Sequence, residues 1–311
     1  MGRYPYRFSR RSTTVCPYGY GAMSIDSLDE ITETLRGEDY VSDDAVSMSL
    51  FLALKMRRPL FLEGAPGVGK TEIARVLSHA FDTELIRLQC YEGLDIHHAL
   101  YEWNYPRQLL QLQAGQKEDL GAIYSDEYLL KRPLLQAIDP KRTSAAVLLI
   151  DEIDRADEEF ESFLLELLSD FQVTFPELGS VKATHRPIVI LTSNRTREIH
   201  DALKRRCIYC WIDYPSLEKE LAIVSMKVPG LSQHVRTQVV NFVQKLRQED
   251  LLKPPGVAET LDWAEALVHL GIAELDAETV RQTLGVVLKN QEDISIVERL
   301  LDDQSWAAQA G

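Results

Sequence analysis

Residues 60–71 read Leu-Phe-Leu-Glu-Gly-Ala-Pro-Gly-Val-Gly-Lys-Thr, an apolar run followed by a glycine-rich turn. The turn fits the pattern G-x-x-x-x-G-K-[ST], with a predicted strand before it and a helical pattern after it. Backbone N–H groups in such a turn, together with the positive end of a helix dipole, form an anion site. The flanks argue against a turn that merely precedes a helix. The predicted phosphate-binding residues are Gly64, Ala65, Pro66, Gly67, Val68, Gly69, Lys70 and Thr71, and the Thr71 hydroxyl is predicted to ligate Mg²⁺.

Two adjacent carboxylates follow a second buried-strand pattern, residues 147–150. In open α/β sheets, ligands bind at the carboxyl ends of such strands. We therefore predict that Asp151 holds Mg²⁺ and that Glu152 polarises the water that attacks a γ-phosphate. A solvated loop start is the alternative for an isolated Asp-Glu pair, and the phosphate-binding turn argues against it.

Polar and basic residues after a third strand pattern, residues 187–191, complete the predicted catalytic set. Asn194 follows this strand, and its amide can hold the attacking water. Arg205 and Arg206 suit an arginine finger that reaches a neighbouring subunit's γ-phosphate, because a guanidinium spreads positive charge over the transition-state oxygens. The spacing tolerates either arginine, and Arg206 is slightly favoured. Taken alone, the pair would be interpreted as a basic surface patch.

Together these motifs resemble those of the AAA+ ATPases. Three further tracts, residues 88–95, 101–106 and 254–260, are similar to the MoxR branch and its CoxD-type members. The resemblance covers the chain from Asp43 onward. It implies an α/β fold of the P-loop type, with a parallel sheet core, helices on both faces and an all-helical lid domain after it. It also implies ATP and Mg²⁺ as cofactors and a homo-oligomeric ring, expected to be hexameric.

The expected domain boundaries follow from composition and pattern. Residues 1–23 combine arginines and aromatics without acidic residues, which is typical of a disordered extension or of an upstream start before Met23, although nucleic-acid or membrane contact is another interpretation. Residues 24–214 are expected to form the nucleotide-binding domain, with a hairpin near 171–183. Such a hairpin before the third strand pattern marks the clade that contains MoxR proteins. Residues 215–311 are expected to form the helical lid.

The resemblance also implies a function. We expect ATP hydrolysis that remodels or matures a metalloenzyme client, of the molybdenum hydroxylase or CO dehydrogenase type, with a von Willebrand A-domain adaptor. A nucleic-acid motor and a nucleotide-gated scaffold without turnover are the alternatives. The net charge of −14 argues against general nucleic-acid binding, and no apolar run reaches the length of a membrane span. The four cysteines suit a reducing compartment, so a cytoplasmic location is expected.

Three features leave alternatives open. The aromatics between Tyr91 and Ile138 face a ring pore, as the resemblance implies, or form a packing patch. Residues 256–263 lack the arginine that family lids present to the γ-phosphate, so either the lid works without one or another residue, such as Arg281, replaces it. Cys207 and Cys210 are favoured as two small buried side chains on a core strand over half of a metal site, because no second ligand pair follows.

Overall fold

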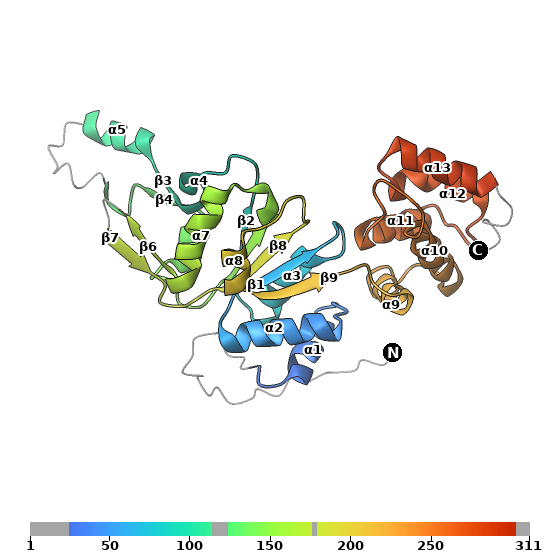
Figure 1. The fold of residues 1–311 in the computed structure, drawn as a ribbon, viewed down its shortest axis with the longest axis horizontal. Helices are drawn as coiled ribbons and strands as arrows, with labels where there is room; N and C mark the ends of the chain where they lie inside the picture. Colours follow the sequence, from blue (N-terminus) through green and yellow to red (C-terminus); the bar gives the residue numbers. More distant parts are fainter. Residues whose placement is uncertain (1–24, 114–123, 176–178, 303–311) are drawn as a thin grey trace, which may run out of the picture.

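The computed structural model describes residues 25–113, 124–175 and 179–302 of the chain. Its centre is a five-stranded parallel sheet in the order β2-β5-β8-β1-β9 (Figure 1). The five strands are β1 (Leu60–Gly64), β2 (Leu85–Gln89), β5 (Val147–Asp151), β8 (Ile188–Ser193) and β9 (Ile208–Ile212). Because all five run the same way, the carboxyl ends of β1, β5 and β8 meet at one edge of the sheet.

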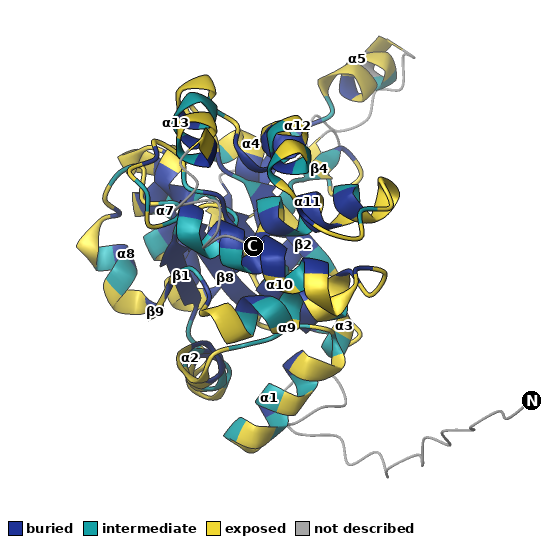
Figure 2. Cartoon of the chain, turned by 90° about the vertical axis from the view of Figure 1, so that its right-hand side faces the viewer, coloured by how far each residue is buried: buried dark blue, intermediate teal, exposed yellow. Residues whose placement is uncertain are grey.

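The inner strands are buried on both faces, which explains why they read as continuous apolar runs. In β5, Leu148 and Ile150 pack into one hydrophobic cluster, whereas Val147 and Leu149 pack into another. Figure 2 shows these buried strands inside a shell of partly exposed helices. This two-sided burial fixes the register of β5, since a shift by one residue would exchange the two faces.

Helices cover both faces of the sheet. One face carries α1 (Leu28–Gly37), α2 (Asp44–Met56) and α3 (Lys70–Ala80). The other carries α4 (Ile96–Leu100), α6 (Pro133–Ile138), α7 (Glu158–Asp170) and α8 (Asp201–Arg206). A short 3-10 turn, Ile153–Arg155, connects β5 to the loop before α7.

Two small antiparallel pairs lie beyond the main sheet. They are β3 (Tyr101–Trp103) with β4 (Leu129–Lys131), and β6 (Gln172–Phe175) with β7 (Gly179–Lys182). Helix α5 (Tyr105–Gln113) projects from the first pair (Figure 1). The Tyr101 ring packs edge-on against Trp103 and Phe175 and so joins the two pairs. These buried aromatics form a packing patch, whereas Tyr91 and Tyr105 are exposed.

Five helices follow the sheet in the described residues up to Asp302, and we call them the lid. They are α9 (Leu217–Lys227), α10 (Gln233–Leu246), α11 (Val257–His269), α12 (Ala277–Val287) and α13 (Gln291–Asp302). They share a separate hydrophobic cluster around the fully buried Trp263. The prediction of a parallel α/β core followed by helices is therefore confirmed. The predicted disordered extension, residues 1–23, lies outside the described residues.

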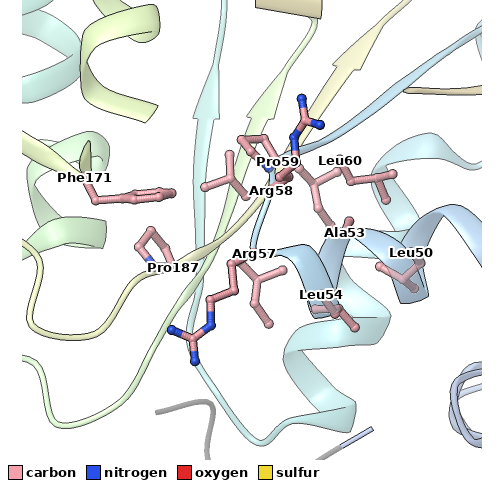
Figure 3. A pocket seen from close by; sticks show the side chains of 12 residues that line it. Leu50, Ala53, Leu54, Arg57, Arg58, Pro59, Leu60, Phe171 and Pro187 are labelled. Carbon is pink, nitrogen blue, oxygen red and sulfur yellow. The ribbon is translucent and has the colours of Figure 1, made fainter. Parts of the chain in front are cut away.

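A cavity of about 10 Å³ lies at the amino-terminal ends of β1 and β8. Figure 3 shows its lining, which includes Leu50, Pro59, Phe171 and Pro187. It has room for about one water molecule, so it is no ligand site. None of the described helices is long and apolar enough to cross a membrane.

Candidate functional site

The phosphate loop, residues 64–71, connects β1 to α3 as predicted from its sequence. Gly67 and Gly69 have φ values of 74° and 92°, in the left-handed region that favours glycine. Gly69 caps the 11-residue helix α3, so the positive end of the helix dipole faces the loop. The backbone therefore has the geometry of an anion site.

Lys70 lies buried under the loop. Its ammonium donates to the carbonyl oxygens of Gly64 and Ala65, at 2.9 and 2.7 Å. Burial lowers the pKa of this ammonium, and the carboxylates of Asp154, Asp151 and Glu152 act in the opposite direction. An ammonium has three N–H donors, so the third can contact a phosphate while two donate to the carbonyls.

Asp151 ends β5 and contacts Thr71 directly. The Thr71 hydroxyl donates to Asp151 Oδ1 at 3.0 Å, and the Thr192 hydroxyl donates to the same oxygen at 2.6 Å. Arg87 of β2 donates to the other carboxylate oxygen, Oδ2, at 2.5 Å. A hydroxyl and a carboxylate side by side are the oxygen donors that Mg²⁺ prefers, so the two predicted ligands fit the ion.

Glu152 follows Asp151 in a left-handed conformation, with φ 55°. Its N–H donates to Thr192 Oγ1 at 2.9 Å, and its carboxylate pairs with Arg155 at 3.2 Å. Thr192 of β8 thus contacts both Asp151 and Glu152, and this bridge between β5 and β8 fixes the direction in which Glu152 leaves the strand.

Asn194 lies just beyond β8 and is held by a buried carboxylate. Asp154 Oδ1 accepts the Asn194 N–H at 3.2 Å, and Asp154 Oδ2 accepts the N–H and hydroxyl of Thr196 at 2.9 and 2.7 Å. Only 3% of Asp154 is exposed. Between these two partners, Arg195 has a φ of 58°, so the loop is held in a conformation that costs energy by itself.

These groups line one cleft of about 500 Å³, a volume typical of small-molecule sites. Of the predicted site residues, the lining includes Pro66, Gly67, Val68, Gly69, Lys70, Thr71, Asp151, Glu152 and Asn194. Gly64 and Ala65 contribute through their carbonyl bonds to Lys70. The rest of the lining comes from Thr192, from residues 39–41, and from α3, α9 and α11. The pattern search did not assign Thr192, Arg87 or Asp154 to the site.

The two predicted finger arginines lie on α8, outside the lining of this cleft. The Arg206 guanidinium donates to Ser169 Oγ at 3.0 Å and to the carbonyl of Ala202 at 3.2 Å. The exposed Arg205 side chain has no hydrogen-bond or ion-pair partner within the described parts of the chain. The two side chains therefore differ in how free they are to reach another molecule.

The two cysteines of the Cys-x-x-Cys pair lie on opposite sides of the sheet. Cys207 belongs to the hydrophobic cluster with α7, whereas Cys210 belongs to the cluster with α2 and α3. Burial raises the pKa of the Cys207 thiol to about 12. Both side chains are buried, as expected, but Cys207 lies just before β9, and β9 is the edge strand of the sheet.

Comparisons with known proteins agree with this geometry. Residues 59–207 match the family described as AAA domain (dynein-related subfamily). The chaperone protein ClpB of Chlamydia muridarum is 26% identical over 207 residues, which are 64% of this chain and 21% of ClpB. An uncharacterized protein of Staphylococcus epidermidis is 24% identical over 86% of this chain and 94% of its own length. The chain thus spans about a fifth of the ClpB relative.

Among solved structures, a RuvB mutant of Thermotoga maritima aligns with a TM-score of 0.47 and 15% identity, over 84% of this chain and 70% of RuvB. The family match spans β1 to the end of α8 and contains both the phosphate loop and the Asp151–Glu152 pair. Residues 59–207 of this chain therefore match an AAA domain over a span that contains the candidate site.

Proposed function

We propose that this chain hydrolyses Mg²⁺-bound ATP as a subunit of a ring, and that the ring remodels a protein client. The proposal rests on one observation: the predicted catalytic residues lie in two separate places. Glu152 and Asn194 line the cleft with the phosphate loop, whereas Arg205 lies outside it and is unpaired within the described residues. An arginine so placed can serve a second copy of the chain, but not the chain's own cleft.

The residues of the cleft have distinct roles in this proposal. Backbone N–H groups of the phosphate loop bind the phosphates, and the Lys70 ammonium contacts them as well. Thr71 and Asp151 would hold Mg²⁺, which neutralises charge on the phosphate oxygens when it is bound. Glu152 orients and polarises the attacking water, and Asn194 holds that water from the β8 side.

Arg205 is the arginine that we assign to the neighbouring subunit's γ-phosphate. The reason is its freedom, since Arg206 already donates to Ser169 and Ala202 on its own chain. This assignment differs from the slight preference for Arg206 on spacing alone. The hexameric ring expected from the resemblance stays part of the proposal.

The Glu152→Gln variant tests the catalytic assignment. Glutamine keeps the shape but not the charge, so we expect ATP binding to stay near the wild-type level while turnover falls at least about a hundredfold. Lys70→Ala removes a cation from the phosphate site and should weaken ATP binding about tenfold or more. Binding is measured with a fluorescent ATP analogue and turnover by phosphate release. Normal hydrolysis by the purified Glu152→Gln variant would refute the role of Glu152.

The client is proposed from similarity. The tracts that resemble CoxD-type proteins support a metalloenzyme of the molybdenum hydroxylase class as client, with a von Willebrand A-domain adaptor, and the ClpB relative is itself named a chaperone. The Glu152→Gln variant is expected to hold its client longer, because it binds ATP without cleaving it. Co-purification with this variant should enrich the metalloenzyme client and the von Willebrand A-domain adaptor over a Lys70→Ala control. Equal recovery with the two variants would refute this choice of client.

A further inference from the structure

The lid touches the phosphate loop through backbone atoms. The carbonyl oxygen of Gly67 accepts the N–H groups of Val257 and Ala258, at 3.0 and 3.2 Å. These two residues begin α11, and the first N–H groups of a helix have no partner within it. One loop carbonyl therefore satisfies two free donors of the lid.

The contact is close enough to require glycine on both sides. A Cβ atom on Gly256 would lie 2.9 Å from both Gly67 Cα and Pro66 O. A Cβ atom on Gly67 would lie 3.2 Å from Gly256 Cα, and Gly67 also has a positive φ. Distances below 3.0 Å to backbone atoms cannot be relieved by turning a side chain, so any larger residue at position 256 must separate the lid from the loop.

The lid holds this turn from its own interior. Arg247 donates to the carbonyl of Pro255 at 2.7 Å and pairs with the fully buried Glu220 at 2.6 Å. Thr260 donates to Glu220 at 2.7 Å and to the carbonyl of Gly256 at 3.0 Å. The turn at 255–256 is thus attached to the core of the lid, and a movement of the lid moves the group that contacts Gly67.

Among the described residues, no arginine of the lid bonds directly to the phosphate loop. Residues 256–263 contain no lysine or arginine, and Arg281 on α12 pairs with Asp302 instead of lining the cleft. The lid cations in the cleft lining are Lys219 and Lys227 of α9. The link between α11 and the loop is made by the backbone where the expected arginine is missing.

This link orients a phosphate-binding group. In a planar trans peptide, the carbonyl of one residue and the N–H of the next point in opposite directions. The carbonyl of Gly67 points at α11, so the N–H of Val68 in the same peptide points away from the lid. We propose that Gly256 is a positioning residue for nucleotide binding: it lets the first turn of α11 hold the Gly67–Val68 peptide in its binding orientation. The proposal rests on the proposed ATP site.

Gly256→Ala is the first test, with Gly285→Ala as its matched control. A Cβ atom on Gly285 meets nothing within 4 Å, so that variant should bind ATP like the wild type. We expect Gly256→Ala to weaken binding of the fluorescent ATP analogue on the order of tenfold, because such overlaps in packed regions are costly. Its melting temperature without nucleotide should stay within a few degrees of the control, since the overlap is relieved by parting the lid from the loop.

Val257→Pro and Val257→Ala form a second pair that adds no atom at position 256. Proline is tolerated at the first position of a helix and lacks the N–H that Gly67 accepts. Gly256 already has the extended backbone that precedes proline, with ψ −174°. We expect Val257→Pro to bind the ATP analogue more weakly than Val257→Ala, which keeps the N–H.

Lys70→Ala is measured alongside these variants to separate two kinds of failure. If Lys70→Ala weakens binding but Gly256→Ala and Val257→Pro bind like their controls, the positioning role of Gly256 is wrong and the ATP site stands. If Lys70→Ala itself binds normally, the site is wrong and the inference fails with it.

Discussion

A single buried carboxylate, that of Asp154, connects the two loops that carry the proposed catalytic side chains. It lies two residues after Glu152 and accepts the backbone N–H of Asn194. Its other oxygen accepts two hydrogen bonds from Thr196. A residue that touches no substrate can in this way set the distance between Glu152, which is proposed to polarise the attacking water, and Asn194, which is proposed to hold it.

Replacement of Asp154 tests this coupling. We expect Asp154→Ala to lower kcat between about tenfold and a hundredfold while nucleotide affinity stays near the wild-type value, because the loop that presents Asn194 loses its anchor. If Asp154 acts through Asn194, the double variant Asp154→Ala/Asn194→Ala should turn over no more slowly than Asn194→Ala alone. Phosphate-release assays on the three variants measure this coupling.

Asp157→Ala is the matched control for that cycle. Asp157 also accepts a backbone N–H, that of Phe160, but it caps α7 and makes no hydrogen bond or ion pair with the Asn194 loop among the described residues. Its loss should reduce the free energy of unfolding by about 1 kcal/mol with little change in kcat. Fully additive losses of kcat in the Asp154 and Asn194 variants would instead mean that Asp154 affects turnover independently of Asn194.

At the scale of single residues, the sequence predicted the residues of the candidate site better than the residues that hold them in place. Asp151, Glu152 and Asn194 were assigned to one site because the carboxyl ends of parallel strands converge. Thr192 and Arg87 carry no such signal. Their contacts with Asp151 depend on the β2-β5-β8 strand order, which no local pattern specifies.

Among the elements, those with long regular patterns were predicted best. The 3- and 4-residue spacing of apolar residues from Glu158 to Asp170 predicts a helix with the bounds of α7. In the stretch that contains α4, β3, α5 and β4, local patterns predict no element. Each of these is at most nine residues long and is held by non-local contacts, such as the pairing of β3 with β4. Short elements of this kind are not stable by themselves, so their local sequence carries little signal.

The break between α12 and α13 was also not predicted. Proline and glycine at residues 229–230, 254–256 and 271 predict breaks between the lid helices, whereas residues 288–290 read Leu-Lys-Asn. Here the Asn290 side chain accepts the N–H of Glu292 at 2.8 Å and so helps to begin α13. Asparagine before a helical pattern is the signal that could have identified it.

Helix α8 is a short element whose position matters for the proposed finger. Its six residues end in Lys204, Arg205 and Arg206, and the last carbonyls of a helix have no partner within it. Arg58, just before β1, donates to the carbonyl of Arg206 at 3.0 Å and also to that of Arg205. The amino end of β1 thus holds the end of α8.

Loss of Arg58 should loosen α8. We expect Arg58→Ala to lower the free energy of unfolding by about 1 kcal/mol, because two exposed carbonyl oxygens would then accept hydrogen bonds from water instead of from the guanidinium. Turnover by the assembled protein should fall several-fold while nucleotide affinity is kept. Lys55→Ala is the control, since its exposed pair with Asp26 contributes little. Chemical denaturation and ATPase assays compare the two variants, and equal turnover in both would contradict the role of Arg58.

At the scale of the whole molecule, the proposed ATP cleft is separated from the arginine pair that is proposed to act on ATP. The cleft opens between the carboxyl edge of the sheet and the lid, whereas α8 lies on the face of the sheet that α7 covers. A contact in which the cleft of one copy meets α8 of the next uses two different surfaces. Contacts of that kind generate rings when the rotation closes.

Mixed assemblies test this arrangement most directly. Arg205→Ala keeps Glu152 but lacks the proposed finger, whereas Glu152→Gln keeps the finger but cannot polarise water. Each variant alone should be nearly inactive. In rings that contain both, an Arg205→Ala subunit receives an intact arginine wherever its neighbour is a Glu152→Gln subunit. For random mixing this occurs at roughly a quarter of the sites, so up to about a quarter of wild-type turnover should return.

The experiment requires co-expression with two different tags and purification through both, so that every assembly contains both chains. The same mixture made with Arg206→Ala is the control for the choice of arginine. We expect Arg206→Ala alone to keep most of its turnover, because its guanidinium is bound to Ser169 and Ala202 of its own chain. If the mixture of Arg205→Ala and Glu152→Gln is no more active than the two separate proteins together, Arg205 does not act between subunits. If complementation appears with Arg206→Ala instead, the finger is the other arginine, and the bonds that hold it in the free chain must break on assembly.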